Sequence, residues 1–471
     1  MHREKVKNLI LLVLVMISIY LSSVLWLDIS LDFTRLEKDD EPLESIYLWD
    51  KVRPVRVIID QQYRHNVYDL SVIEPVWEAY REVLVNLLRA AYDENDIQVQ
   101  NMDGNGIIIH FESPLSMEIM TQGLGVTNNR LTNRIEKLSW MGFDPDARLF
   151  YLNDGQSTYQ VPHTFDDMSM VLLYNEMKDF AKSHQNQRLF LSEALAEIPY
   201  SKEVLVLSPV FIRSEIDIED QDAINEIAKA YFGDRFDYAR RMVDSFRTIS
   251  FIYRNEKVLR LYEEGLLELF DAIESTQGET SLYRSLMVAL NFIENFLGFP
   301  EQGYLSRVES ILQDGKYGYR FIFSYQFLDL PIVFSQVREE KAMQIEVLDG
   351  RVVYYQRFIR VFDENIEQEM QTAHVLSPQL ILDYNIDFMT DLYLEDANHQ
   401  LLTFDEAKNK ILSSINEVYL AYFDPSRRSR DQLIRSVWVF RTNDRKYIFN
   451  GITGAIIEEQ IIEEGVAHGL E

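Results

Sequence analysis

A run of twenty residues without a charged side chain lies close to the N-terminus. It extends from Asn8 to Leu27, between Lys7 and Asp28. At ~1.5 Å rise per residue, a helix of this length covers ~30 Å, the hydrocarbon thickness of a bilayer. The run therefore predicts a transmembrane helix over residues 8–27, with the long remainder of the chain on one side of the membrane.

The tail of residues 1–7 sets the expected orientation. It carries three basic residues against Glu4, so the positive-inside rule places the N-terminus in the cytoplasm. A cleaved secretory signal is the alternative reading. The run is longer than a usual signal core, however, and it lacks a small-x-small cleavage site because bulky Trp26 and Leu27 end it. We expect a single-pass cell-membrane protein whose bulk is extracytoplasmic.

Two serines mark one face of the predicted span. Ser18 and Ser22 are four residues apart, so they share a helix face in a small-xxx-small pattern that allows another transmembrane helix to approach closely. They are our candidate partner-binding residues. The alternative is that serines are merely tolerated at these positions.

Charge and cysteine content exclude several function classes. Lys and Arg number 46, Asp and Glu number 76, and the net charge is −30 with no cysteine. Because the tail is basic by two charges, the residues beyond it carry −32. Such a field repels nucleic acid. The missing cysteines exclude disulfides, thiolate zinc sites, iron–sulfur clusters and thiol nucleophiles, and they suit an exported protein.

The length of 471 residues suggests two to four domains. Helical and strand-like periodicity alternate, which is typical of packed α+β domains. We predict an N-terminal extracytoplasmic domain over residues 31–185, a central α+β domain over 186–285 and a C-terminal α+β domain over 286–471. The polar stretch of residues 276–280 precedes a helical segment over 282–297 and marks the join between the last two.

Within the first domain, alternation and turn residues predict short elements. They are a strand over 54–59, a helix over 76–92, a hairpin of 97–100 with 107–112, and a second hairpin of 148–153 with 158–162.

The clearest helix start lies in the last third of the chain. Thr403 and Glu406 form a capping box, and apolar residues at three-to-four spacing continue as far as Tyr422, before Asp424 and Pro425. We expect a helix over this stretch, followed by strands at 436–442, 446–450 and 455–457.

An earlier region shows a similar pattern. It has an amphipathic stretch at 224–232, strands at 249–253 and 258–262, and Gly265, much as Gly454 follows the later strands. This favours an internal repeat, in which two domains are related copies. Chance similarity of two ordinary meanders is the alternative.

Local motifs for catalysis are absent from the sequence. We find no nucleophile elbow, phosphate-binding glycine loop, zinc-protease helix or dinucleotide fingerprint. The eight histidines show no HxH or HxxxH pairing, and carboxylates are so abundant that an acid/base pair cannot be singled out. We assign no catalytic, cofactor-binding or metal-binding residues and expect a protein that is not an enzyme.

One stretch resembles a calcium-binding loop. Residues 101–112 place oxygen-bearing side chains at positions 1, 3, 5 and 12 and glycine at position 6, with Asn101 where Asp is usual. The flanks have a strand pattern, however, and Asn, Asp and Gly also gather in hairpin turns because they tolerate positive φ. We favour the hairpin.

Several short segments give the chain a resemblance to the YycH family of membrane-anchored regulators. The segments are the N-terminal anchor with Trp49 and Arg53-Pro54 after it, Ala289–Gly298, Tyr319-Arg320-Phe321, Leu330-Pro331-Ile332, and Ile345–Arg360 with Gly350 and Tyr354-Tyr355-Gln356-Arg357. At Asn295–Gly298 the sequence departs from a more polar family pattern.

The resemblance implies a non-enzymatic role in Gram-positive bacteria. Family members look like parts of a membrane complex with YycI and the WalK (YycG) sensor kinase, acting through transmembrane helices on autophosphorylation and so on cell-wall homeostasis. It also implies that the last two domains have a related, YycI-like topology. The sequence leaves open whether the exterior part forms a homodimer.

Two other functions stay as alternatives. One is an extracytoplasmic protein that captures a peptide or wall fragment independently of a kinase. The other is an anchored hydrolase, for which the sequence offers no nucleophile or metal constellation. A soluble exterior fragment that functions alone would favour the first of these.

Overall fold

The computed structural model describes most of the chain from residue 45 onward. The described ranges are 45–59, 65–67, 70–90, 97–102, 105–126, 130–163, 165–183, 187–190, 197–200, 206–207, 210–254, 256–272, 281–313, 315–328, 330–336, 341–362, 373–395, 402–425, 431–442 and 444–462. The predicted span over 8–27 and its two serines lie outside them. Among the described residues, no helix is long and apolar enough to cross a membrane.

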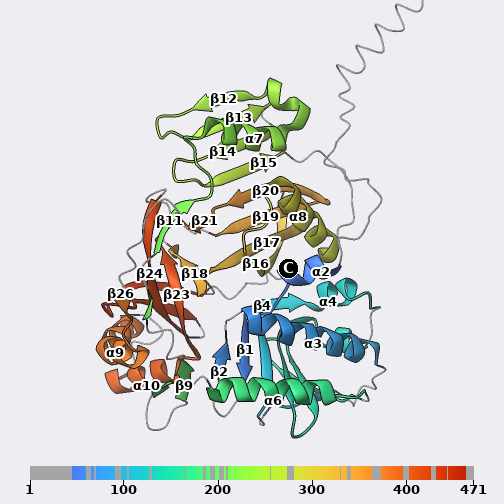
Figure 1. The fold of residues 1–471 in the computed structure, drawn as a ribbon, viewed down its shortest axis with the longest axis vertical. Helices are drawn as coiled ribbons and strands as arrows, with labels where there is room; N and C mark the ends of the chain where they lie inside the picture. Colours follow the sequence, from blue (N-terminus) through green and yellow to red (C-terminus); the bar gives the residue numbers. More distant parts are fainter. Residues whose placement is uncertain are drawn as a thin grey trace, which may run out of the picture. The chain divides into compact units, whose positions relative to one another are not determined.

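Residues 45–183, here called the N-terminal module, form a mixed α+β layer (Figure 1). Its sheet has the order β2-β1-β4-β5-β6-β7-β3 in the described part. The strands are β1 (Arg56–Ile59), β2 (His65–Val67), β3 (Gln98–Val99), β4 (Ile107–Ser116), β5 (Lys137–Asp144), β6 (Leu149–Asn153) and β7 (Thr158–Val161). The helices are α2 (Ser45–Lys51), α3 (Leu70–Arg89), α4 (Met117–Gly123), α5 (Arg130–Arg134) and α6 (Met168–Ser183).

Helix α3 supplies the apolar layer of this module. Val76, Tyr80, Val83 and Leu87 are buried at three-to-four spacing, and the Tyr80 hydroxyl donates to the carbonyl oxygen of Ile107 in β4. The helix starts at Leu70, six residues earlier than the sequence predicted. Pro75 is therefore the sixth residue of the helix and lies inside it, where it removes one backbone N–H donor from the helical ladder.

One predicted hairpin of the module is confirmed and one is wrong. Strands β6 and β7 pair as expected, from Phe150 with Val161 to Asn153 with Thr158. Strand β3 does not pair with β4; it pairs with β7, while β4 lies between β1 and β5. The turn residues signalled a change of chain direction, but the partner of each strand is set by packing of the whole sheet, which local sequence does not encode.

An antiparallel sheet of eight described strands follows in the order β12-β13-β14-β15-β20-β19-β17-β16. Two groups of four, each preceded by a helix, meet where β15 pairs with β20. The first group is α7 (Gln221–Phe232), η2 (Gly233–Tyr238), β12 (Arg240–Val243), β13 (Ile249–Tyr253), β14 (Lys257–Leu261) and β15 (Leu267–Asp271). The second is α8 (Leu282–Phe296), β16 (Gly303–Gln313), β17 (Lys316–Phe327), β19 (Met343–Leu348) and β20 (Arg351–Arg357).

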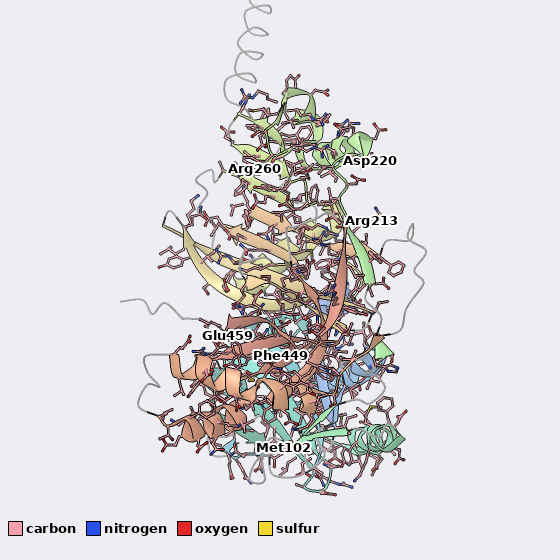
Figure 2. All side chains as sticks on the ribbon, turned by 90° about the vertical axis from the view of Figure 1, so that its left-hand side faces the viewer. Met102, Arg213, Asp220, Arg260, Phe449 and Glu459 are labelled. Atoms are coloured by element: carbon pink, nitrogen blue, oxygen red, sulfur yellow. The ribbon has the colours of Figure 1, made fainter. Side chains whose placement is uncertain are left out.

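Helices α7 and α8 pack on this sheet through apolar faces. Asp220 caps α7 by accepting from the backbone N–H groups of Asp222 and Ala223 (Figure 2), and Ser281 caps α8 in the same way. Phe292 of α8 meets the ring of Tyr355 in β20 edge to face, with centroids 5.3 Å apart. The predicted helix over 282–297 is thus confirmed to within one residue.

The C-terminal part forms a strongly curved sheet. Strand β18 (Leu330–Phe334) pairs in parallel with β23 (Glu417–Asp424), which continues antiparallel through β24 (Asp431–Arg441), β25 (Arg445–Asn450) and β26 (Ile456–Ile461). Gln460 of β26 donates to the carbonyl oxygen of Phe334, and the Ser335 hydroxyl donates to Glu458. The two ends of the sheet therefore approach each other around a small interior that contains Val333 and Ile448.

Helices α9 (Pro378–Glu395) and α10 (Phe404–Ser414) cover the other face of this sheet. The capping box at Thr403 and Glu406 is confirmed. The predicted length of the helix is wrong, because α10 ends at Ser414 and the apolar residues up to Tyr422 belong to β23. Both faces of β23 are buried, so its apolar run matched helical spacing by coincidence.

The remaining strands link these parts. Strand β11 (Val210–Ser214) pairs with β24 and with β21 (Arg360–Phe362). Two small pairs are β8 (Gln187–Phe190) with β9 (Glu197–Tyr200) and β10 (Val206–Leu207) with β22 (Ala373–His374).

Both segments of the predicted repeat contain a helix followed by an antiparallel meander. The sequence-predicted strands correspond to β13 and β14 in one segment and to β24, β25 and β26 in the other. Gly265 and Gly454 have positive φ, of 89° and 72°, before the last strand of each segment. That these domains are related copies, and the boundaries drawn between domains, stay predictions.

Candidate functional site: the α2 contact and the ionic junction

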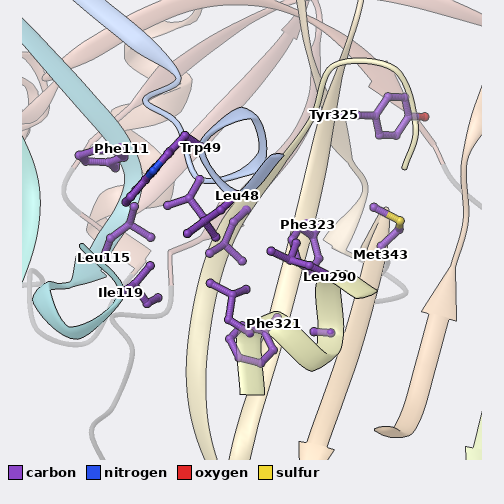
Figure 3. Packing of buried hydrophobic residues seen from close by; sticks show 14 of the residues in the cluster. Leu48, Trp49, Phe111, Leu115, Ile119, Leu290, Phe321, Phe323, Tyr325 and Met343 are labelled. Carbon is purple, nitrogen blue, oxygen red and sulfur yellow. The ribbon is translucent and has the colours of Figure 1, made fainter. Parts of the chain in front are cut away.

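Helix α2 is the first described element, and it is held from two sides. Its Leu48 and Trp49 are buried between the rest of the N-terminal module and the eight-stranded sheet (Figure 3). The rings of Trp49 and Trp77 meet at 73° with centroids 5.9 Å apart. The indole N–H of Trp77 donates to the backbone oxygen of Trp49 at 3.4 Å. Figure 3 shows Phe111 and Leu115 on one side of α2 and Phe321 and Phe323 on the other.

Gly123, the last residue of α4, permits this close packing. A Cβ atom at this position would lie 2.7 Å from Leu48 and 2.9 Å from Trp49. Both distances are shorter than a van der Waals contact, so a side chain here would push α2 away from α4.

Arg53, just after α2, ties the helix to β16. Its side chain is buried, donates to the backbone oxygen of Gln302 at 3.1 Å and lies with its guanidinium 5.1 Å from the ring of Tyr304. Burial lowers the pKa of Arg53. Burial, followed by the charge of Glu112 and the hydrogen bond that the Tyr304 hydroxyl donates to it, raises the pKa of Tyr304 well above its usual value. The Ser113 hydroxyl also donates to the backbone oxygen of Ser306. Thus α2 and β4 cover the first residues of β16, which are buried.

A second polar contact joins the module to the C-terminal sheet. Arg56 of β1 pairs with Glu417 of β23 at 2.8 Å, and Arg441 of β24 lies 3.6 Å from the same carboxylate. Burial, followed by the charges of Arg56 and Arg441, holds the pKa of His110 well below its usual value. His110 is therefore neutral at physiological pH.

The ionic junction lies where β11, β20, β21 and β23 meet. Arg357 donates to both carboxylate oxygens of Glu215 at 2.7 Å and to the backbone oxygen of Gly298 at 2.7 Å. Burial alone would lower the pKa of Arg357, but Tyr355 and Glu215 outweigh it and raise that pKa. A bidentate pair of this kind fixes geometry as well as charge.

A second pair in the junction is completely enclosed. The side chains of Arg360 and Asp424 each have 0% exposure and lie 3.0 Å apart. Arg360 also donates to the Ser214 hydroxyl at 2.7 Å, and its backbone N–H donates to the Tyr325 hydroxyl at 3.0 Å. Removal of one partner would leave a buried charge uncompensated.

These contacts join elements that are far apart in the sequence. In the part of the chain that the structure describes, no group of three His, Asp or Glu residues could hold a metal ion. In the calcium-like stretch, Asp103 lies outside the described residues, and Glu112 lies within β4, where a calcium loop would end at a helix.

The site residues predicted from the sequence and the residues of this site are different. The predicted contact residues Ser18 and Ser22 lie outside the described residues. Trp49, Arg53 and Arg357, which carried the family resemblance, all lie at the contacts between modules. Glu215 and Asp424 were missed as ionic partners, because they are 142 and 64 residues from their arginines and no local pattern links them. Because Asp and Glu are so abundant in the sequence, neither residue stands out as an ionic partner.

Comparison with known proteins identifies the fold. YycH from Bacillus subtilis is 12% identical in sequence and superposes with a TM-score of 0.51 over 85% of this chain and 96% of that chain. The C-terminal domain of YpeB from Bacillus megaterium is 11% identical, with a TM-score of 0.26 over 52% of this chain and 98% of that domain. No family model and no curated protein sequence matches. The chain therefore has a mixed α+β, YycH-like fold.

Proposed function

We propose that this chain is a non-enzymatic, membrane-anchored regulator of the WalK (YycG) sensor histidine kinase. It acts in a complex with YycI and modulates kinase autophosphorylation and, through it, cell-wall homeostasis. The observation that supports the proposal is the YycH-like fold, which extends over 96% of the solved YycH chain. The short segments from Trp49 to Arg360 that resemble the YycH family support it from the sequence.

The proposed topology has one transmembrane helix over 8–27 and an N-terminus in the cytoplasm. Residues 31–185, 186–285 and 286–471 form three extracytoplasmic domains, the last two with related, YycI-like topology. The uncharged run of twenty residues and the excess of acidic residues beyond it support this arrangement.

The proposed mechanism couples the exterior fold to the kinase through the anchor. Helix α2 begins at Ser45, after the predicted span in sequence. Trp49 packs on Trp77 of α3, and Arg53 bonds to Gln302 just before β16. A change in the exterior modules would therefore reach the chain segment that leads to the membrane. A difference of ~1–3 kcal/mol in how the anchor packs on two kinase states gives at least a several-fold change in activity.

The Ser18 and Ser22 face is the proposed contact with the kinase helices. The double substitution Ser18→Leu/Ser22→Leu should change autophosphorylation several-fold in cells that lack the native chain, with export unchanged. Ser23→Leu, on a different helix face, is the matched control and should have no effect. If the double variant signals like the native chain, the proposed contact face is wrong.

A further inference from the structure

Strand β12 and the residues around it form an unusual exposed surface. Of the sixteen large hydrophobic side chains that are exposed among the described residues, four lie between residues 238 and 246. Tyr238 is 78% exposed, Met242 47%, Val243 60% and Phe246 79%. We call residues 238–247 the β12 surface. Met242 and Val243 are consecutive in a strand, so apolar side chains are exposed on both faces of this edge. Exposed apolar side chains concentrated in one short segment are a feature of protein-binding sites.

The turn that presents Phe246 is held in place by its own hydrogen bonds. The Asp244 carboxylate accepts from the backbone N–H groups of Phe246 and Thr248 at 2.8 and 2.9 Å. Arg247, with a φ of 61°, pairs with Glu263 at 2.8 Å. Because the turn is fixed before any partner arrives, binding through Phe246 would cost little ordering entropy.

The backbone of β12 offers an open sheet edge. Among the described strands, β12 pairs with β13 alone. The N–H of Asp244 donates to the carbonyl oxygen of Thr248, and in an antiparallel ladder every second residue bonds across the pair. The backbone N–H and C=O groups of Arg240 and Met242 therefore point toward β13. Those of Arg241 and Val243 point outward from the edge of the sheet.

The opposite edge of the same sheet shows how such a strand can be used. Strand β16 is the first strand after α8, as β12 is the first after α7, and each is an outer strand (Figure 1). The outer side of β16 contacts the N-terminal module through Ser306 and Tyr304. No described element covers the corresponding side of β12, whose four residues are all exposed.

Charge distinguishes between the occupants of this edge. Arg240 and Arg241 are both exposed, although the chain as a whole carries −30. If β12 of a second copy paired antiparallel with it through these outward groups, a register with Arg241 opposite Arg241 would place like charges directly opposite each other, which is unfavourable. An acidic strand gains from the same charges.

From these observations we propose that the β12 surface binds an extended acidic segment of another protein. The segment adds to the sheet as a strand beside β12 and bonds to the backbone of Arg241 and Val243. Its Asp or Glu side chains pair with Arg240 and Arg241, and an apolar side chain packs on Phe246. This binding function does not depend on the proposed regulation of a kinase.

The test uses the full-length chain in detergent and two labelled peptides. One is an eight-residue peptide of alternating Glu and Val with a central Phe, and the other has Lys in place of each Glu. Fluorescence anisotropy should show saturable binding of the acidic peptide and at least tenfold weaker binding of the basic one. Equal binding of both peptides, or no saturable binding of the acidic peptide below millimolar concentration, overturns the proposal.

Two variants and one control test the geometry. Val243→Pro removes an outward N–H and should weaken binding of the acidic peptide at least tenfold, whereas Val243→Thr keeps the N–H and should bind normally. Arg240→Glu/Arg241→Glu should reverse the preference between the peptides. If Val243→Pro binds as well as the native chain, strand addition is wrong. If the native chain forms a dimer that Val243→Pro abolishes, the occupant is a second copy and the proposal is overturned.

Discussion

The two halves of the eight-stranded sheet are built alike and end differently. Each has a helix followed by four antiparallel strands, and they join at β15 and β20. In the half that begins with α8, the outer strand β16 is covered by α2 and β4, and the enclosed ionic junction lies beside β20. In the half that begins with α7, the outer strand β12 and its turn are exposed. The same architecture thus gives an internal interface at one end and an available surface at the other.

The largest effect is predicted in the ionic junction, which adjoins β20 and contrasts with the exposed ion pair in the half that begins with α7. Asp424→Ala leaves Arg360 buried without its carboxylate, and we expect the free energy of unfolding to fall by ~3–5 kcal/mol. Urea denaturation of the full-length chain in detergent measures it. The matched control is Glu263→Ala, which removes the exposed partner of Arg247 and should leave the midpoint unchanged. Equal losses of unfolding free energy in both variants would contradict the predicted difference between the enclosed ion pair and the exposed one.

The α2 contact should be sensitive to a single methyl group. Gly123→Ala places a Cβ within 2.7 Å of Leu48, so we expect a loss of ~1–3 kcal/mol in unfolding free energy. Trypsin should also cleave after Lys51 faster in this variant, because α2 is displaced. An unchanged midpoint and unchanged cleavage would show that α2 does not pack as described.

The pH dependence of stability tests the contact between β4 and the C-terminal sheet. Burial and the charges of Arg56 and Arg441 hold the pKa of His110 well below 6.5 in the folded chain. The unfolded chain therefore takes up a proton first as the pH falls, and the unfolding free energy should decrease below about pH 6.5 by up to ~1.4 kcal/mol per pH unit. His110→Gln should flatten this slope between about pH 7 and pH 5. Parallel curves for both chains would contradict the environment assigned to His110.

The smallest effect is expected at the β12 surface. Phe246→Ala removes a side chain that is 79% exposed, so the unfolding free energy should change by less than about 0.5 kcal/mol. Phe251→Ala, in the adjacent strand β13, removes a buried ring and should cost ~3–5 kcal/mol. A large loss of unfolding free energy in Phe246→Ala would mean that this side chain stabilises the fold, and it would contradict its assignment to a binding surface.

The sequence predicted those elements whose signals are local. The capping box at Thr403 and Glu406, the β6–β7 hairpin and helix α8 all depend on residues within a few positions of each other. The fold class followed from the alternation of helical and strand-like periodicity. These features are present in the structure because the tertiary contacts favour the same conformation as the local sequence does.

The errors and omissions arise where residues far apart in the sequence determine the local structure. Strand β3 pairs with β7, 60 residues along the chain. The apolar run up to Tyr422 ends in a strand because β18 and β24 pair with both edges of β23 and both of its faces are buried. Asp424 was noted only as a helix stop, yet it is the partner of Arg360. The exposed β12 surface gave no signal at all, since Met242 and Val243 look like core residues in the sequence.

Regulation of a sensor kinase through the membrane anchor is tested most directly with purified components. Autophosphorylation of the WalK-type kinase would be measured in proteoliposomes without the chain, with the full-length chain, and with a chain whose residues 8–27 are replaced by an unrelated transmembrane helix. We expect the full-length chain to change the rate several-fold and the anchor-swapped chain to have no effect. The same rate with and without the full-length chain would contradict the proposed function, and an equal effect of the anchor-swapped chain would move the contact to the exterior domains.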